Sequence, residues 1–271
     1  MGALLCEAGK LDPEDAERVL RVQQDLGLRF GETAVRMGLV SEEDIEQALA
    51  RQFDYPYLRK GQANLSPRLV AAYEPFSRQV EALRAVRSQL MLRWFARGRR
   101  ALAVAGVMPE DGASLFAANL ALVFSQLGEQ TLLVDANLRD PRQHELFGLR
   151  PRQGLSDLLS GRGDLDVILR VPGFSDLSLM PAGTLPPNPQ ELLARVAFRK
   201  LHAQFQARYD VVLYDLPPFM AGADALSVAG CAGGVLLVAC KGRTRIADIS
   251  RMAGQMAEAG AEVVGSVVVE F

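Results

Sequence analysis

Hydrophobic and polar positions follow two kinds of period along the chain, and they predict an alternation of buried strands and amphipathic helices. Short apolar runs bounded by turn residues predict strands over residues 101–105, 131–134, 211–214, 234–239 and 263–269. Apolar residues at helical spacing predict helices over 80–94, 115–127 and 244–256. About six or seven parallel strands connected by helices predict an α/β fold built on a doubly wound sheet.

The N-terminal part contains a repeat instead. Gly2, Gly9, Leu11 and Glu14 recur 29 residues later as Gly31, Gly38, Val40 and Glu43. Each unit predicts a short helix that ends at a glycine and a second helix capped by Asp12 or Ser41. We therefore expect a small helical domain over 1–57. Residues 58–79 favour a linker or a short helix against the main domain, which covers 80–271.

Composition narrows the classes of protein. The chain has 271 residues, of which 49% are apolar and 23% charged, so it can bury a sizeable core. No apolar run approaches the ~18 residues of a membrane span, which predicts a cytoplasmic protein. The net charge of −2 gives no indication of a nucleic-acid partner, and we expect none. The three cysteines lack metal-ligand spacing and are expected to be reduced and structural.

The turn after the strand at 101–105 occupies the position of a phosphate-binding loop. The strong pattern is G-x-x-x-x-G-K-[ST], in which backbone N–H groups hold phosphates, the Lys contacts the outer phosphates and the hydroxyl binds Mg²⁺. Gly112 and Ser114 fit this pattern, but Ala113 stands at the Lys position. Glu110 and Asp111 place carboxylates in the loop, and these would repel a triphosphate unless Mg²⁺ or an Arg offset them.

Two acidic residues follow apolar strands at the edge where ligands of open parallel sheets bind. Asp135 ends the run 131–134, and Asp215 ends the run 211–214 just before Pro217 and Pro218. Both could cap neighbouring backbone donors, but two such acids beside one loop favour a ligand site. Surface or packing roles are the better interpretation for His144 and His202.

Several motifs together resemble the bacterial tyrosine kinases of the capsular and exopolysaccharide chain-length-determinant system. With its small N-terminal domain the chain is most similar to the EpsG type. Besides the loop, the motifs occur in the family's order and are Glu81-x-x-Arg84-x-x-Arg87, LVDANLRDP at 133–141, GTLPPNPQELL at 183–193 and YDVVLYDLPP at 209–218.

The resemblance implies a P-loop NTPase-like fold of the partitioning-ATPase type and a site for ATP or ADP with Mg²⁺. It assigns catalysis to Asp135, Asn137 and Asp215, with Asp135 orienting the attacking hydroxyl or a metal-bound water. Besides the loop residues, two positions depart from the family pattern. Asn137 replaces a usual Asp, which weakens acid–base or metal chemistry at that position. Val269 replaces an Asn close to the adenine, which weakens base recognition. Carried over, the nucleotide-contacting residues are Gly106, Gly112, Ala113, Ser114, Leu115 and Arg139, and the metal ligands are Ser114, Asp135 and Asp215.

The resemblance also implies partners. Glu81, Arg84 and Arg87 lie along one side of a helix, either as a solvated face or as a subunit contact in a homo-oligomer. The family's partner is a membrane polysaccharide co-polymerase, which could recruit the chain to the inner membrane. The N-terminal repeat is similar to the MshEN-type domain of type II secretion and pilus ATPases, some of which bind cyclic di-GMP. Because only the second unit carries a basic residue before its glycine, as Arg29-Phe30-Gly31, we favour a protein-docking module over a dinucleotide sensor.

Two functions stay open from the sequence. The first is a Mg²⁺-dependent kinase that phosphorylates protein tyrosine and so controls polysaccharide chain length. Its acceptor would be Tyr55, Tyr57, Tyr73 or another protein, because the last tyrosine, Tyr214, falls in an expected buried strand. The second is a catalytically weak scaffold of the same fold, favoured by Ala113. A cargo-partitioning ATPase fits the fold but not the Pro-Pro-Asn-Pro motif.

Overall fold

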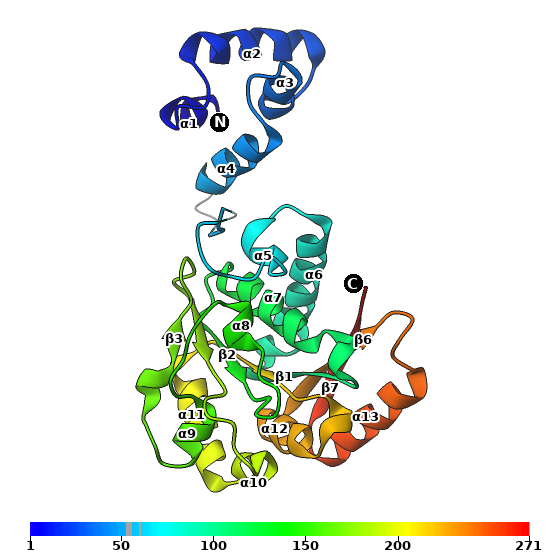
Figure 1. Ribbon diagram of the computed structural model, residues 1–271. Coiled ribbons are helices and arrows are strands. Elements are labelled where there is room, and N and C mark those ends of the chain that lie inside the picture. The colour runs from blue at the N-terminus through cyan, green and yellow to red at the C-terminus, as the bar shows by residue number, and fades with distance from the viewer. Residues whose placement is uncertain (53–55, 60, 271) are drawn as a thin grey trace. The chain divides into compact units, whose positions relative to one another are not determined.

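The computed structural model describes residues 1–52, 56–59 and 61–270, and the chain forms two compact units, Met1–Tyr57 and Leu58–Phe271 (Figure 1). No helix in this described part combines the length and the apolar character needed to cross a bilayer.

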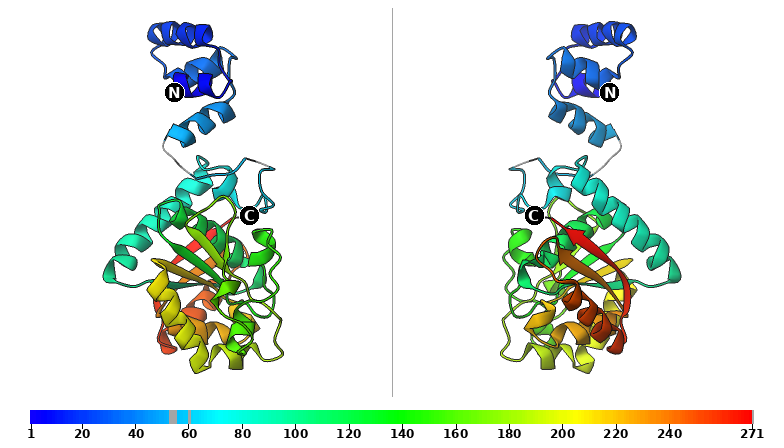
Figure 2. Two further views of the ribbon diagram at one scale, coloured as in Figure 1. Left: turned by 90° about the vertical axis from the view of Figure 1, so that its left-hand side faces the viewer. Right: turned by 90° about the vertical axis from the view of Figure 1, so that its right-hand side faces the viewer.

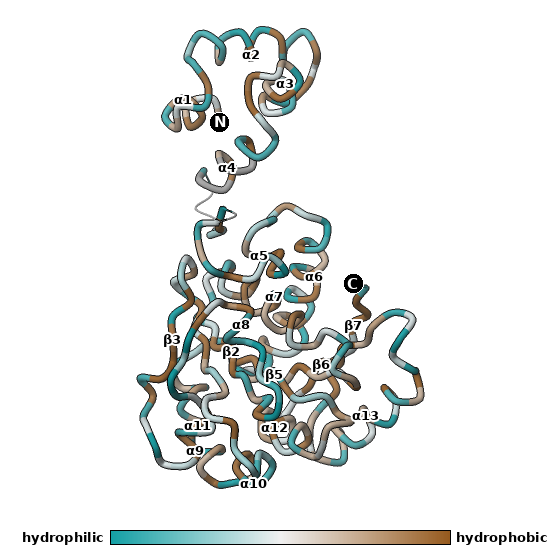
Figure 3. Tube along the Cα trace, viewed as in Figure 1, coloured by the Kyte–Doolittle hydropathy of each residue, from teal (hydrophilic) through white to brown (hydrophobic). Residues whose placement is uncertain are grey.

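The first unit consists of the two expected helix pairs. Gly9 and Gly38, at equivalent places in the repeat, have φ angles of 66° and 70°, so each ends a short helix in the left-handed region. Leu5, Val19 and Ala34 form part of its core, and α2 alternates between hydrophilic and hydrophobic turns in Figure 3. The helices are α1 (Gly2–Glu7), α2 (Pro13–Leu26), α3 (Phe30–Arg36) and α4 (Glu42–Gln52).

The second unit is built on a seven-stranded sheet in the order β3-β4-β2-β5-β1-β6-β7. All pairs are parallel except β3 with β4, which is antiparallel. Every residue of β1, β2 and β5 is buried, as expected where helices cover both faces of a parallel sheet. The strands are β1 (Ala101–Gly106), β2 (Thr131–Asp135), β3 (Leu169–Arg170), β4 (Leu177–Met180), β5 (Val211–Asp215), β6 (Gly234–Cys240) and β7 (Glu262–Val269).

Helices pack on both sides of this sheet (Figure 2). Alternate residues of each strand face opposite layers: Leu102 and Val104 join the core under α6 and α7, whereas Ala103 and Tyr214 join the core under α11 to α13. The doubly wound α/β fold predicted from the sequence is confirmed. The helices of this unit are α5 (Val70–Tyr73), α6 (Arg78–Arg93), α7 (Ala113–Ser125), α8 (Gln143–Leu146), α9 (Leu155–Leu159), α10 (Pro189–Leu193), α11 (Val196–Arg208), α12 (Asp224–Ala232) and α13 (Ile246–Glu258).

The segment 58–79 belongs to this second unit. Leu65 and Leu69 are buried in the core that α6 and α7 share, and α5 packs beside α7. The backbone N–H of Ser66 donates to the carbonyl of Leu146 at 2.8 Å. These contacts fix the segment against the main fold, as the short-helix interpretation of this segment expected and a free linker would not.

Candidate functional site

The phosphate-loop position lies between β1 and α7 at the carboxyl edge of the sheet. A short 3-10 turn over Pro109–Asp111 leads to Gly112, whose φ of 74° favours glycine and directs the chain into α7 at Ala113. The loop and the first turn of α7 line a cavity of about 620 Å³ together with Asn137 and Arg139. The structure therefore brings together all six residues expected to contact a nucleotide.

Asp111, whose carboxylate is expected in the phosphate loop, is bonded to other groups of the protein. Asp111 is buried, and one carboxylate oxygen, Oδ2, accepts hydrogen bonds from the backbone N–H groups of Val107 and Met108, each at 2.8 Å. Its other oxygen accepts from the Thr244 hydroxyl at 2.5 Å. Asp111 is not among the residues that line the cavity, whereas Glu110 is. The Asp111 carboxylate thus accepts hydrogen bonds from three donors and does not line the cavity.

Asp135 and Asp215 are direct neighbours in the register of β2 and β5 and are fully buried. Gln143, at the start of α8, joins them. Its backbone N–H donates to Asp135 Oδ2 at 3.0 Å, and its side-chain Nε2 donates to Asp215 Oδ2 at 2.7 Å and to the carbonyl of Ser114 at 2.9 Å. Three oxygens of this group, Asp135 Oδ1, Asp215 Oδ1 and Gln143 Oε1, are buried without a hydrogen-bond partner. A role of the two acids as caps of backbone donors does not explain these unpartnered oxygens.

The two carboxyl groups resist ionisation. Burial raises the pKa of Asp215 to about 7, although hydrogen bonds from Gln143 and Ser114 oppose the shift. Burial and then the neighbouring Asp215 carboxyl raise the pKa of Asp135 well above its ordinary value. A cation between the carboxylates would relieve both causes, so the donor set and its unpartnered oxygens fit Mg²⁺.

The protein alone does not supply a complete cation shell in its described part. Across residues 1–52, 56–59 and 61–270, no three His, Cys, Asp or Glu side chains are grouped to hold a metal ion. Mg²⁺ commonly takes one or two carboxylates and completes its shell with phosphates and water. Ser114, Asp135 and Asp215 match this type of site.

Asn137 shapes the loop after β2. Its Oδ1 accepts from the backbone N–H groups of Arg139 and Asp140 at 3.3 and 3.1 Å, and its Nδ2 donates to the Asp140 carbonyl at 2.7 Å. These bonds use both ends of the amide. Asn137 lies at the cavity as expected, but its contacts are those of a turn residue.

Arg139 is positioned by a carboxylate that sequence reasoning missed. Its guanidinium donates to both oxygens of buried Asp224 at 2.7 and 3.0 Å. Arg142, also on the cavity wall, pairs with Asp140 at 2.9 Å and Glu145 at 3.5 Å. No sequence motif indicated Asp224, because it lies 85 positions from Arg139.

A second hollow of about 530 Å³ lies beside the first and shares Arg68 and Leu115 with it. Val267, Val268 and Val269 of β7 line it. Val269 therefore lies near Leu115 of the loop helix, and it offers an apolar side chain there.

Glu81, Arg84 and Arg87 lie on α6 and line neither hollow. Arg84 forms an ion pair with Glu81. Arg87 donates to the Val123 carbonyl of α7 at 2.6 Å. Arg87 thus already serves the packing of α6 on α7.

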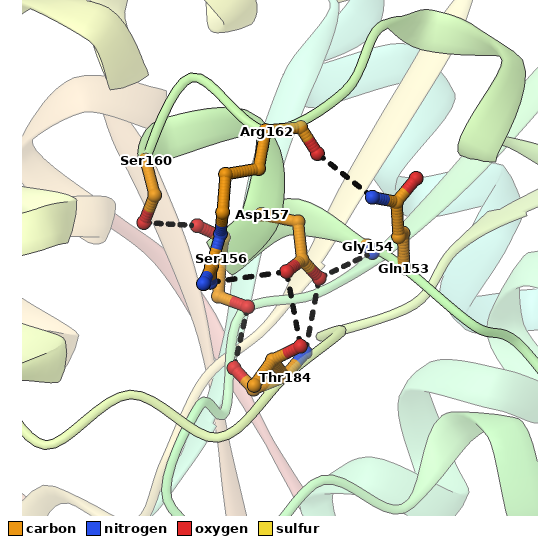
Figure 4. A network of polar contacts seen from close by, with 7 residues as sticks. All are labelled: Gln153, Gly154, Ser156, Asp157, Ser160, Arg162 and Thr184. Atoms are coloured by element: carbon orange, nitrogen blue, oxygen red, sulfur yellow. Dashed lines mark hydrogen bonds and ion pairs between the residues drawn. The ribbon is translucent and has the colours of Figure 1, made fainter.

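The Pro-Pro-Asn-Pro motif follows a loop that Asp157 of α9 holds (Figure 4). Asp157 Oδ2 accepts from the backbone N–H groups of Gly154 and Thr184 at 3.1 and 3.0 Å, and Oδ1 accepts from the Thr184 hydroxyl at 3.0 Å. Burial would raise the pKa of Asp157, but the bonds from Thr184 and Gly154 and the charge of Arg162 outweigh it and lower the pKa. Pro189 then begins α10, as its position predicted.

The tyrosines and histidines differ in exposure. Tyr214 is fully buried, as predicted, and its hydroxyl lies 2.8 Å from His202 Nδ1, so His202 has a packing role. The Tyr73 hydroxyl donates to the Leu65 carbonyl at 2.9 Å. Tyr55 lies outside the described residues.

Comparison with known proteins places this geometry in a family. No family model matches the chain. The tyrosine-protein kinase YwqD of Bacillus subtilis is 31% identical over 212 residues, which cover 78% of this chain and 90% of that protein. The chain belongs to the bacterial tyrosine kinase family.

Other relatives in this family are longer. The tyrosine-protein kinase Wzc of Salmonella typhimurium is 34% identical over 200 residues, 74% of this chain but 28% of Wzc, so the chain spans about a quarter of such relatives. The solved kinase domain of the Escherichia coli tyrosine kinase Etk has a TM-score of 0.74 and 30% identity, and covers 80% of this chain and 85% of that domain. The predicted P-loop NTPase-like fold is thereby confirmed.

Proposed function

We propose that the chain is an EpsG-type cytoplasmic tyrosine kinase of an exopolysaccharide or capsule system. It binds ATP with Mg²⁺ and transfers the γ-phosphoryl group to protein tyrosine. The observation that supports this proposal is the pair of buried carboxyl groups, Asp135 and Asp215, with unpartnered oxygens beside the loop. Two acids that share one buried site are costly for folding and are typical of a ligand site.

Mg²⁺ would be held by Ser114, Asp135 and Asp215 and would neutralise charge on the transferred phosphoryl group. The backbone N–H groups at the start of α7 would bind the phosphates. Asp135 would orient the tyrosine hydroxyl. Gln143, which bonds both aspartates, would keep their carboxylates in register.

A second function is favoured by Ala113. Without the Lys, less positive charge faces the transition state than in a complete phosphate loop. The chain would then bind nucleotide without efficient transfer and would regulate a membrane polysaccharide co-polymerase by binding, recruited by it to the inner membrane.

Calorimetric titration with ATP and ADP, each with and without Mg²⁺, tests nucleotide binding. We expect micromolar, Mg²⁺-dependent binding. Mass spectrometry of the protein after incubation with Mg²⁺-ATP and a tyrosine-containing acceptor separates the two functions: phosphotyrosine supports the kinase, and binding without phosphotyrosine supports the scaffold. Absence of binding at millimolar nucleotide would contradict the nucleotide-binding proposal.

We further propose that α6 forms a contact between protomers and that the MshEN-like first unit docks a secretion-type protein rather than cyclic di-GMP. Titration of the whole chain with cyclic di-GMP tests the second point, and micromolar binding would overturn it.

For the α6 contact, reversing Arg84 to Glu is expected to lower the mass of the assembly, because it places like charge against the partner surface. Sedimentation velocity measures the mass. The double variant Glu81→Arg with Arg84→Glu keeps an ion pair within the helix. It therefore shows whether a lower mass comes from loss of that ion pair or from loss of the protomer contact. An unchanged mass in both variants would leave α6 as a solvated face.

A further inference from the structure

The cavity at the loop contains four arginines, and two of them are already paired. Arg139 is held by Asp224, and Arg142 by Asp140 and Glu145. In the described residues, the guanidinium groups of Arg68 and Arg243 make no hydrogen bond or ion pair. Both side chains are exposed at the wall that also includes Ala113. Two arginines without a partner in the described part of the chain therefore line the same cavity as Ala113, which stands at the Lys position of the loop.

The residue after Arg243, Thr244, is bonded to the phosphate loop through Asp111. Thr244 accepts from the backbone N–H of Cys240 at 2.8 Å and donates to Asp111 at 2.5 Å. Asp111 in turn binds the backbone N–H groups that begin the loop. Asp111 thus links the turn after β6 to the phosphate loop. The Asp111 carboxylate thereby bonds the residue that follows Arg243 in the chain.

The backbone of Arg68 is bonded to α7. Its carbonyl accepts from Asn119 Nδ2 of α7 at 3.3 Å, and Asn119 Oδ1 accepts from the backbone N–H of Ala71 at 3.0 Å. The same Asn119 Nδ2 donates to the Leu115 carbonyl at 3.0 Å. The buried amide therefore ties the Arg68 backbone to the first turns of the helix that begins at Ala113.

We propose that Arg68 and Arg243, acting in the same chain, supply the cationic contact to the β- and γ-phosphates that Ala113 cannot make, and that Asp111 and Thr244 position Arg243. This inference rests on the proposed nucleotide binding. Guanidinium groups suit the task because their planar donors match phosphate oxygens in pairs. They also offset the charge of Glu110, which lines the same cavity.

The test is calorimetric titration of Arg68→Gln, Arg243→Gln and the double variant with Mg²⁺-ATP, AMP and inorganic tripolyphosphate. Each single change is expected to weaken ATP and tripolyphosphate binding by about tenfold, the usual loss for one charge-assisted hydrogen bond. AMP, which has no outer phosphate, is expected to bind these variants and the unaltered protein equally. Arg245→Gln is the matched control, because Arg245 is exposed two positions further on and lies off the cavity wall.

Two further variants separate the roles. Thr244→Val removes the hydroxyl that bonds Asp111, and we expect it to weaken ATP binding as Arg243→Gln does. Adding Ala113→Lys to the double variant is expected to restore binding. If the unaltered protein binds Mg²⁺-ATP and the double variant binds it equally well, the arginine assignment is overturned and nucleotide binding stands. If the unaltered protein binds neither ATP nor tripolyphosphate, nucleotide binding itself is overturned.

Discussion

Asp215→Asn is expected to abolish the Mg²⁺-dependent part of nucleotide affinity. Asp215 carries one of the unpartnered buried oxygens, and an amide lacks the charge that a divalent cation requires there. We expect the affinity for Mg²⁺-ATP to fall about 100-fold or more, because loss of even an outer partner of a bound metal commonly costs 10–100-fold. Titration calorimetry at pH 8 with and without Mg²⁺ measures the change.

The same carboxyl gives this binding a pH dependence. With the pKa of Asp215 near 7, the group is mostly protonated at pH 6 and ionised at pH 8, so Mg²⁺ affinity is expected to rise across this interval. Without a bound cation, the stability of the fold is expected to change with pH in the opposite direction to the Mg²⁺ affinity. The folded state holds a proton that the unfolded chain, with an ordinary pKa of 3.8, has released, so stability falls as the pH rises from about 4 to 7. Asp215→Asn is therefore expected to melt at a higher temperature than the unaltered protein at pH 8.

Asp210→Asn is the control for both measurements. Asp210 precedes β5 at the end opposite to Asp215, and its carboxylate is exposed beside Arg100. We expect it to leave nucleotide affinity and its pH dependence unchanged. If Asp215→Asn kept full Mg²⁺-dependent affinity, the assignment of Asp215 as a metal ligand would be wrong.

The strands and the acids that end them could be predicted because local sequence decides them. A short apolar run such as 131–134 must be buried, and the residue that ends it lies at the carboxyl edge whatever the rest of the chain does. Asp135 and Asp215 meet because their strands are neighbours in a parallel sheet. Gly112 could be recognised in the same way, since its left-handed backbone is a local property of the turn.

The remaining site residues depend on contacts between distant segments. Arg68 lies in a stretch without periodicity, and contacts with distant residues, such as the bond from Asn119 51 positions away, bring it to the loop. Asp111 accepts a hydrogen bond from Thr244, which lies 133 residues away. The sequence does not show this contact, so from the sequence alone the carboxylate is interpreted as a charge that repels phosphates. Gln143 lies in the LVDANLRDP neighbourhood, but its role arises from a side chain that reaches Asp215 on another strand. Its position shortly after this motif is a signal that the sequence does offer.

The second large effect concerns stability. Trp94 ends α6 as a fully buried side chain, and its indole Nε1 donates to the Ala101 carbonyl at 2.8 Å. Pairing of β1 with β6 begins at Ala103, so the indole satisfies a carbonyl near the start of β1. The ring also covers Gly234, where an added Cβ would lie 2.4 Å from Trp94 Cζ2. Helix α6, β1 and β6 thus meet at one side chain.

Trp94→Ala is expected to lower the free energy of unfolding by about 3–5 kcal/mol, the usual cost of emptying a large aromatic site in a core. That is a large share of the ~5–15 kcal/mol that stabilises a typical domain. Urea unfolding followed by circular dichroism measures it, and fluorescence of this single tryptophan identifies the transition of the second unit in the unaltered protein.

Leu92→Ala provides the control on the same helix. Leu92 is 71% exposed, and a change there is expected to stay within about 0.5 kcal/mol. The loss of unfolding free energy in Trp94→Phe is expected to lie between those of Trp94→Ala and Leu92→Ala. Phe keeps much of the ring volume but leaves the Ala101 carbonyl without the indole donor. If Trp94→Ala unfolded at the same urea concentration as Leu92→Ala, the junction of α6 with the sheet would not depend on this side chain, and the burial of Trp94 would be irrelevant to the stability of the unit that carries the site.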